Sequence, residues 1–374
     1  INHRTHHPLS LFVVNYEGWT INDHHPHAIY PLPQSMANDS DDELRANKVA
    51  QSIAFTAAQT PPSLRRKAAA GLFVVTLVWG ATFIWMKQLL NSIQPQYEEF
   101  GGAAVVSLMV FARFAIAAIC MLIFFPKART AVADKTMWKG GLLLGGLMMI
   151  GFITQMVGLD EINPSTSAFL TSLYVVMTAV LTIFMTKTKP SRILLFAVLL
   201  ATFGAGFIEG PPHLTWGWGE ILTVISALFF ALHIVYTQKV TQALDPVSIT
   251  STSFLIVVFG SLLLALYFTD ISNPEFWSIL IADGVIIPLL CLGIGGSFFC
   301  ILMVNFFQRY LHPVQAAIIY AFEPVWATAY GLGLGLVDWT WWILIGGGAL
   351  LLGNLMVEMR VDDQRNEDAL PSNS

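Results

Sequence analysis

Charged residues are scarce in this chain, and their scarcity excludes most classes of water-soluble protein. Asp, Glu, Lys and Arg make up 11% of the 374 residues, whereas soluble domains carry roughly 25%. No basic tract indicates binding to nucleic acid. The three cysteines, Cys120, Cys291 and Cys300, lie in apolar runs and are typical of small hydrophobic packing residues rather than of disulfides or a metal set. With hydrophobic residues at 55%, this composition predicts a membrane protein.

Motifs for nucleotide hydrolysis and for zinc-dependent hydrolysis are also missing. Neither a Walker A sequence nor an HExxH sequence occurs. The glycine runs at 140–146, 292–296 and 346–348 lie in apolar segments, where small residues let helices approach, and not in phosphate-binding loops. We therefore expect no cofactor, and we expect that ATP does not drive the protein directly.

Ten apolar segments match the length that a helix needs to cross a bilayer, which is about 20 residues. They lie at 68–90, 103–125, 138–159, 164–186, 191–209, 217–238, 246–268, 284–306, 314–336 and 339–358. Of the nineteen Lys and Arg residues, seventeen lie on one side of the predicted membrane. Lys87 lies toward the opposite side, and Arg113 lies within a span. Because cytoplasmic loops are rich in Lys and Arg, the side with these seventeen residues is predicted to be cytoplasmic, and both termini lie on it. The sequence thus predicts an all-α polytopic membrane protein with ten transmembrane helices.

The two ends of the chain differ from this apolar part. Residues 1–60 are polar and are predicted to be disordered, and residues 359–374 are predicted to form a cytoplasmic tail. Because the chain starts at Ile1 and an ordinary polar leader follows Met36, we interpret residues 1–35 as an over-extended gene start or a disordered tail. Six histidines in this segment could bind a metal, but disorder is the favoured interpretation.

The apolar part divides into two similar halves, 68–209 and 217–358. Pro164 and Pro313, 149 positions apart, each open an apolar span, and WGATFIWMKQ at 79–88 can be aligned with FALHIVYTQK at 230–239. Five spans in each half make the second copy enter the membrane from the other side. Inverted repeats of this kind form two alternately accessible gates around one site in many transporters. At the matched positions 174 and 323, one half has Tyr and the other has Glu.

Three ionisable residues are predicted to lie deep in the bilayer, where a charge needs a partner, a cavity or a function. Arg113 could hold an anionic substrate group, pair with Glu323, or tie helices together through backbone carbonyls. Glu323 precedes Pro324, which leaves the Tyr320 carbonyl without its helical donor, so a substrate or proton-coupling role competes with a structural kink. For His233, ordinary packing is favoured over substrate contact.

Further candidates come from polar residues that share helix faces. Gln155 shares a face with two glycines, so close packing is its alternative to a site role. Trp79 and Lys87 on the first span complete the set, although Lys87 could simply extend to the outer surface. A stripe of hydroxyl residues on the fourth span could pack helices or line a water-filled path; it comprises Ser167, Thr171, Tyr174, Thr178 and Thr182.

Several of these motifs resemble one family. WGATFIWMK at 79–87, ARF at 112–114, QMVGLDEINPSTSAFLTSLYVV at 155–176 and FEPVWA at 322–327 resemble bacterial EamA-type transporters of the drug/metabolite transporter superfamily, over roughly 68–358. The resemblance implies two inverted five-helix repeats in the bacterial inner membrane, and amino acids, related metabolites or drugs as substrates.

The leading hypothesis for function is a secondary transporter, a permease for efflux of a small metabolite by alternating access. Proton exchange and simple facilitated export both remain open, and the oligomeric state is not indicated. The partners are then a small molecule, the lipid bilayer and, in one variant, protons. An intramembrane enzyme using Arg113, His233 and Glu323 is one alternative, although no nucleophile accompanies them. A non-transporting receptor or scaffold is the other.

Overall fold

The computed structural model describes residues 60–162, 164–186, 191–207, 216–269, 273–335, 338–353 and 356. Within these ranges the chain forms helices and connecting loops, with no strand. Seven helices are long and apolar enough to cross a membrane, which confirms the class of polytopic helical membrane protein. The predicted segment 1–60, except for its last residue, and the predicted tail at 359–374 lie outside the described residues.

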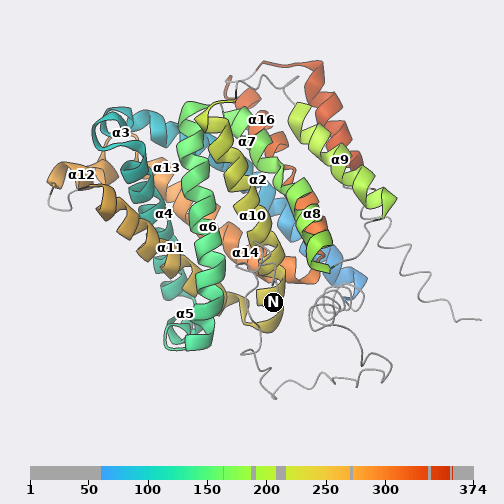
Figure 1. Ribbon diagram of the computed structural model, residues 1–374, viewed down its shortest axis with the longest axis horizontal. Coiled ribbons are helices and arrows are strands. Elements are labelled where there is room, and N and C mark those ends of the chain that lie inside the picture. The colour runs from blue at the N-terminus through green and yellow to red at the C-terminus, as the bar shows by residue number, and fades with distance from the viewer. Residues whose placement is uncertain are drawn as a thin grey trace, which may run out of the picture. The chain divides into compact units, whose positions relative to one another are not determined.

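The elements of the two halves follow one another in a similar order (Figure 1). The first half contains α2 (Pro62–Ser92), α3 (Gln94–Phe100), α4 (Gly102–Phe124), α5 (Pro126–Ala131), α6 (Lys135–Glu161), α7 (Pro164–Ser172), α8 (Tyr174–Thr186) and α9 (Arg192–Phe207). The second half contains α10 (Trp218–Ala243), α11 (Pro246–Phe268), α12 (Pro274–Ser278), the short helix η3 (Ile279–Ile281), α13 (Ile286–Leu290), the π-helix η4 (Cys291–Phe299), α14 (Cys300–Phe307), the short helix η5 (Gln308–Tyr310), α15 (Pro313–Tyr320), α16 (Glu323–Gly333) and an apolar helix at Trp341–Gly353.

Helical structure is found at all ten predicted spans, but three of them are not among the seven helices that are long and apolar enough to cross a membrane. The segments 191–209 and 339–358 contain the shorter apolar helices Arg192–Gly204 and Trp341–Gly353. The segment 314–336 is divided between α15 and α16. That these three segments cross the bilayer, and that both termini are cytoplasmic, therefore stays a prediction.

Prolines begin several of these helices, and Pro313 is one that the sequence placed at the start of a span. Pro62, Pro246 and Pro313 occupy the first turn of α2, α11 and α15, where a missing N–H leaves no hydrogen bond unmade. Asp245 caps α11 by accepting from the backbone N–H of Ser248 at 3.0 Å. Helix starts in this chain are thus specified locally.

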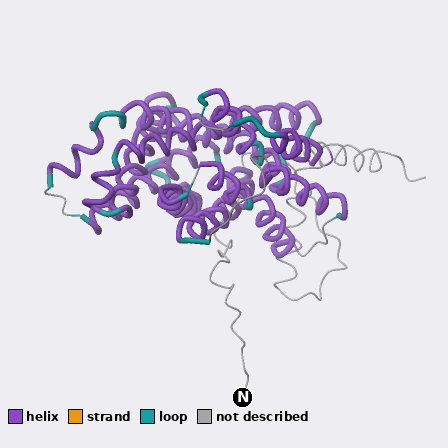
Figure 2. The backbone as a smooth tube through the Cα atoms, turned by 90° about the horizontal axis from the view of Figure 1, so that it is seen from above, coloured by secondary structure: helices purple, strands orange, loops and turns teal. Residues whose placement is uncertain are grey.

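Glycines bring helices of the two halves into close contact. A Cβ at Gly158 of α6 would lie 2.7 Å from the carbonyl oxygen of Gly219 in α10, and one at Gly80 of α2 would lie 2.4 Å from Cβ of Trp326 in α16. The first-half helix α6 therefore packs along α10 and also against α11, and α2 packs against α14, α15 and α16. Figure 2 shows this arrangement from above, with helices forming nearly all of the described chain. The two halves interleave around a shared interior.

One feature recurs in both halves at the same relative position, which is a break in the helix that follows the hairpin proline. The first break lies at Leu173 between α7 and α8, and the second at Phe322 between α15 and α16. The N–H of Leu173 donates to the carbonyl of Leu170 at 3.3 Å, and the N–H of Phe322 donates to the carbonyl of Ile319 at 3.1 Å. Each of these atoms in the second half is 149 positions after its counterpart in the first half, so the repeat extends to individual hydrogen bonds.

Candidate functional site

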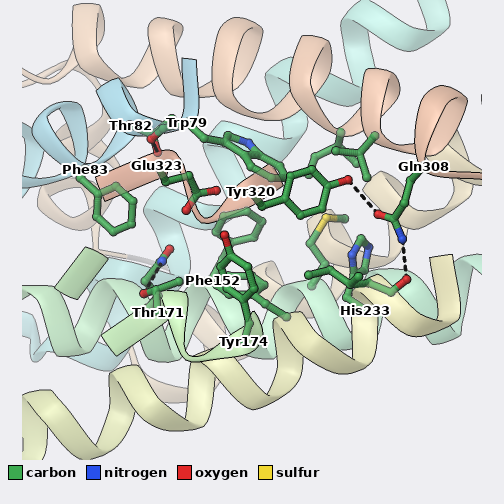
Figure 3. A pocket seen from close by; sticks show the side chains of 16 residues that line it. Trp79, Thr82, Phe83, Phe152, Thr171, Tyr174, His233, Gln308, Tyr320 and Glu323 are labelled. Carbon is green, nitrogen blue, oxygen red and sulfur yellow. Dashed lines mark hydrogen bonds between the residues drawn. The ribbon is translucent and has the colours of Figure 1, made fainter. Parts of the chain in front are cut away.

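A cavity lies in the interior, with a wall built from both halves (Figure 3). The cavity has a volume of about 60 Å³. Its lining comes from α2 (Trp79, Thr82, Phe83), α6 (Met148, Phe152, Gln155), α7 and α8 (Thr171, Tyr174), α10 (Phe230, His233, Ile234), α14 and η5 (Ile301, Val304, Gln308), and α15 and α16 (Tyr320, Glu323). Both helix breaks face this cavity, through Tyr174 and Glu323.

Seven of the nine residues predicted for the site line this cavity together. They are Trp79, Gln155, Thr171, Tyr174, His233, Tyr320 and Glu323. Arg113 and Lys87 are not among the lining residues, and the structure places them beside it and beyond one of its ends, respectively. A substrate or coupling role for any of the nine stays a prediction.

Glu323 is the acidic residue of the cavity wall, and it begins α16. The positive end of the helix dipole lies at this terminus and favours a negative charge there. Its side chain is 7% exposed and points across the cavity toward the hydroxyl of Tyr174 (Figure 3). Pro324 has no N–H, so the carbonyl of Tyr320 lacks its helical donor, as the sequence indicated. An acid and a free carbonyl thus meet at the break.

Tyr174 occupies the matching position at the start of α8. Its side chain is 3% exposed, and its hydroxyl has no hydrogen-bond partner among the described residues. On the same stripe, Thr171 accepts a hydrogen bond from Nε2 of Gln155 at 3.2 Å. The other stripe residues are buried but do not line the cavity; they are Ser167, Thr178 and Thr182. The stripe therefore contributes two side chains to the site and does not form a continuous path within it.

A chain of polar contacts between α10, η5 and α15 lies at the end of the cavity that contains Gln308. The hydroxyl of Tyr320 donates to Oε1 of Gln308 at 2.9 Å, and Nε2 of Gln308 donates to the carbonyl of Ile234. His233 lies beside them, with Nδ1 3.4 Å from the Thr237 hydroxyl. Figure 3 shows this chain of contacts in the wall of the cavity.

Trp79 joins the first helix to the π-helix of the second half. Its Nε1 donates to the carbonyl of Gly296 at 3.1 Å, and its ring meets that of Tyr320 edge to face at 5.3 Å between centroids. A π-helix often marks a functional site, because its wider turn leaves carbonyls free for other donors. The orientation of the indole is therefore fixed by a hydrogen bond from its Nε1 and by packing against the ring of Tyr320.

Arg113 lies behind the cavity wall and is 2% exposed. Its Nε donates to Oγ of Ser297 at 2.6 Å, and its guanidinium carbon lies 4.4 Å from the ring centroid of Phe152. Phe152 lines the cavity, so this ring separates Arg113 from it. Nη2 has no partner among the described residues. No ion pair between Arg113 and Glu323 is present. Arg113 joins α4 to the π-helix through the side chain of Ser297, whereas backbone carbonyls were the partners considered from the sequence.

Sequence reasoning missed the apolar part of the wall, together with Thr82 and Gln308. Phe83, Phe152 and Phe230 carry no distinguishing signal, because similar residues occur in every span. Gln308 carried a usable signal, since an amide near the end of an apolar span needs a partner.

The chemistry of the wall suits a small organic molecule rather than a metal. Aromatic and aliphatic faces surround one carboxyl, one imidazole, two phenols and two amides, which is the usual composition of a ligand pocket. Among the described residues, no three His, Cys, Asp or Glu side chains are grouped so that they could hold a metal ion. None of the described residues in the wall is Lys or Arg.

The fold and the site together define a multi-pass helical membrane protein with an interior cavity between two related halves. The model of the EamA-like transporter family matches residues 66–209 and 217–359. The chain belongs to this family and is a membrane transporter, which confirms the resemblance seen in the sequence motifs.

Two further comparisons agree with this assignment. The chain is 27% identical over 333 residues to an uncharacterized transporter of Archaeoglobus fulgidus, covering 88% of this chain and 98% of that protein. A solved structure described only as the crystal structure of a protein matches with a TM-score of 0.59 and 12% identity, over 80% of this chain and 99% of the other. At that identity the likeness concerns the fold alone.

Proposed function

We propose that this protein is a secondary transporter that carries a small amphipathic metabolite outward through the central cavity by alternating access. The observation that carries this proposal is the meeting of two broken helices, one from each half, at a single cavity. Broken helices at matched positions of inverted repeats form the substrate sites of many secondary transporters. The inner membrane of a bacterium is the proposed location.

The cavity favours a small substrate with an apolar part and a positively charged group. Its volume of about 60 Å³ exceeds the roughly 10–15 Å³ that a cavity needs to hold a single water molecule. Trp79 and Tyr320 offer aromatic faces, which attract ammonium groups as well as apolar surface. Glu323 supplies the acidic group of the wall, without a Lys or Arg beside it in the described lining. Amino acids, related amines and small cationic drugs fit this description.

Glu323 also gives a simple basis for exchange of the substrate with protons. A buried carboxylate without a counter-charge is unfavourable, and either a proton or a cationic substrate relieves it. Binding of one therefore competes with binding of the other. The hydroxyl of Tyr174 lies across the cavity from this carboxyl, and the thiol of Cys300 also lies near it; neither supplies a positive charge.

The position of Arg113 weakens the enzyme alternative. An acid/base set would need Arg113, His233 and Glu323 in one site, but Phe152 separates Arg113 from the cavity that contains the other two. The receptor alternative gives no reason for a cavity at two matched helix breaks.

Substrate flux in liposomes tests the proposal. Purified protein is reconstituted with a pH-sensitive dye inside the vesicles, and a panel of labelled amino acids and amines is offered at several values of external pH. We expect a subset to be transported with coupled proton movement, and Glu323→Gln to abolish the dependence on pH. Glu275→Gln, at an exposed position in α12, is the matched control. Full activity of Glu323→Gln with unchanged pH dependence would refute proton exchange at this residue.

A further inference from the structure

Lys87, which is not part of the cavity wall, holds the end of a neighbouring helix. It lies near the end of α2, and its Nζ donates to the carbonyls of Leu159 and Asp160, at 3.0 Å each. These carbonyls belong to the last turn of α6, where no intrahelical donor is available. A positive charge is favourable at this end of a helix dipole. The contact joins α2 to the segment that leads to Pro164.

Gln238 makes the corresponding contact in the second half. It lies near the end of α10, and its Nε2 donates to the carbonyl of Leu311 at 2.9 Å, directly after η5. One turn further along α10, Nε2 of Gln242 donates to the carbonyl of Arg309 at 3.2 Å. These amides join α10 to the segment that leads to Pro313.

The donors of the two contacts occupy aligned positions of the repeat, and their acceptors precede the matched prolines by two to five residues. The alignment of 79–88 with 230–239 places Lys87 opposite Gln238, 151 positions later. Their acceptors lie within five residues of the matched hairpin prolines, Pro164 and Pro313. In each half, the side chain at this aligned position thus binds a backbone carbonyl of the segment that precedes the hairpin proline.

The two contacts lie at opposite ends of the molecule's interior. The helices α6 and α10 run antiparallel, because Gly158 meets Gly219 at one end and Gly140 meets Val240 at the other. The contact of Lys87 lies at the end that contains Gly158, and Gln238 lies at the end that contains Gly140. About 20 residues of α10 separate the two ends, which corresponds to roughly 30 Å.

Each contact lies about one turn beyond the cavity wall. Phe83 and Gln155 line the cavity and are four residues before Lys87 and Leu159, the two sides of the first contact. Ile234 lines the cavity four residues before Gln238, on one side of the second contact. A contact in such a position lies between the cavity and the nearer membrane face.

We propose that Lys87 and Gln238 are a matched pair of latches, one for each gate of the transporter. The proposal rests on alternating access as the proposed function. The bonds of Lys87 close the outer end, and the bond of Gln238 closes the inner end. Both latches are formed in this structure, so opening either end breaks one of them. Each carbonyl sits at a helix end, where water entering the opened gate can replace the side-chain donor.

The chemistry of the two latches differs in a way that suits export. Lys87 donates two charge-assisted hydrogen bonds, whereas Gln238 and the neighbouring Gln242 each donate a neutral one, and hydrogen bonds from charged donors are the stronger. The outer gate is therefore held more firmly than the inner gate. In the absence of substrate this difference favours opening toward the cytoplasm, where an exporter loads.

Labelling of a cysteine in the cavity from each side of the membrane tests the latches. The probe is Thr171→Cys, in a background in which the three native cysteines are replaced by alanine. A membrane-impermeant maleimide is applied to right-side-out or inside-out vesicles, and the ratio of outer to inner labelling rates is measured. We expect Lys87→Met to raise this ratio by about fivefold or more, and Gln238→Met to lower it by about fivefold. The exposed neighbour Gln88→Met is the control and leaves the ratio unchanged.

Two further variants distinguish a shift in gate opening from damage to the fold. The double variant of Lys87→Met and Gln238→Met returns the ratio toward the parent value, because the two shifts oppose each other. Lys87→Gln introduces the residue of the other half, keeps a donor, and produces a smaller shift in the same direction as Lys87→Met. Shifts in the same direction for both single methionine variants, or an unchanged ratio in both, would overturn the proposal.

The labelling assay needs no substrate, so its failure is distinguishable from failure of the proposed function. Opposite shifts in a protein that moves no substrate in liposomes would support the latches and refute transport through the cavity. Proton-coupled flux with unchanged labelling ratios would support the function and refute the latches.

Discussion

Replacement of Arg113 by methionine separates a structural role for this buried charge from a role in binding. Met has a similar length, no charge and no polar donor, so it removes the hydrogen bond to Ser297 and the contact with the Phe152 ring. If the guanidinium only ties α4 to the π-helix, substrate transport continues in this variant. If it holds an anionic substrate group, transport is lost while the fold persists.

The expected effect on stability is small, because the cost of burying the charged arginine opposes the gain from its hydrogen bond and its contact with the Phe152 ring. Insertion of an arginine at the centre of a membrane helix is unfavourable by about 2.5–3.5 kcal/mol. A hydrogen bond from a charged donor contributes about 1.5–3 kcal/mol, and a desolvated cation–π contact contributes about 2 kcal/mol. The two contacts together contribute about 3.5–5 kcal/mol, so Arg113→Met should lower the free energy of unfolding by about 2.5 kcal/mol or less.

Ser297→Ala is the informative companion variant. It leaves Nε of Arg113 buried without an acceptor, which is unfavourable by about 1–3 kcal/mol. We therefore expect Ser297→Ala to destabilise the protein more than Arg113→Met does. In the double variant, loss of the hydroxyl has almost no further effect, since its donor is already gone.

The measurement is unfolding of the purified protein in mixed micelles titrated with dodecyl sulfate, followed by tryptophan fluorescence, with liposome flux measured in parallel. A loss of more than about 3 kcal/mol in Arg113→Met would contradict the partial cancellation of these terms. Intact folding of Arg113→Met with loss of flux would contradict a purely structural role and assign the guanidinium to an anionic group of the substrate.

Two further predictions concern the π-helix and the helix break, and both are measured by unfolding in the same micelles. Gly296→Ala should destabilise the folded protein by about 1–3 kcal/mol, since the added Cβ would lie 2.7 Å from Thr82 and 3.1 Å from Arg113. The control is Gly347→Ala, whose added Cβ meets nothing within 4 Å, and we expect it to have little effect on stability. Equal stability of the two variants would contradict the close packing of α2 on the π-helix. Pro324→Ala should change stability by less than about 1 kcal/mol, because this proline lies in the first turn of α16; a gain near 3 kcal/mol, as for removal of a proline from a helix interior, would contradict a break built into the fold.

The sequence located the helices well and the interior only in part. Long apolar runs and prolines at helix starts are strong local signals, so helical structure occurs at every predicted span. The break at Phe322 was also predictable, because Pro324 removes a donor. The break at Leu173 was not predictable, since residue 175 is Val and no local residue requires a break there. The common feature of the two breaks is their position in the packed repeat, which is a property of the tertiary structure.

The candidate site shows the same division between local and tertiary information. Polar residues such as Gln155 and Thr171 were predicted because they interrupt apolar spans and share a helix face with other polar residues. The separation of Arg113 from the cavity was not predictable, because it depends on the π-helix that brings Ser297 beside α4. The partners of Lys87 were equally hidden, since backbone carbonyls at a helix end leave no trace in the residue pattern.

The differences between the two halves carry a consequence for direction. If both halves were identical, a twofold rotation would relate the inward-open and outward-open states, their free energies would be equal, and substrate gradients alone would set the direction. Two matched positions break this equality, since the first half has Tyr174 and Lys87 where the second half has Glu323 and Gln238. Each half thus carries one ionisable group of a different sign, the acid at the cavity and the base at a gate. Under the proposed proton exchange, protonation of Glu323 changes the charge inside the cavity and leaves the hydrogen bonds of Lys87 in place. In that proposal an ion gradient acts through Glu323, and Lys87 biases which gate opens first.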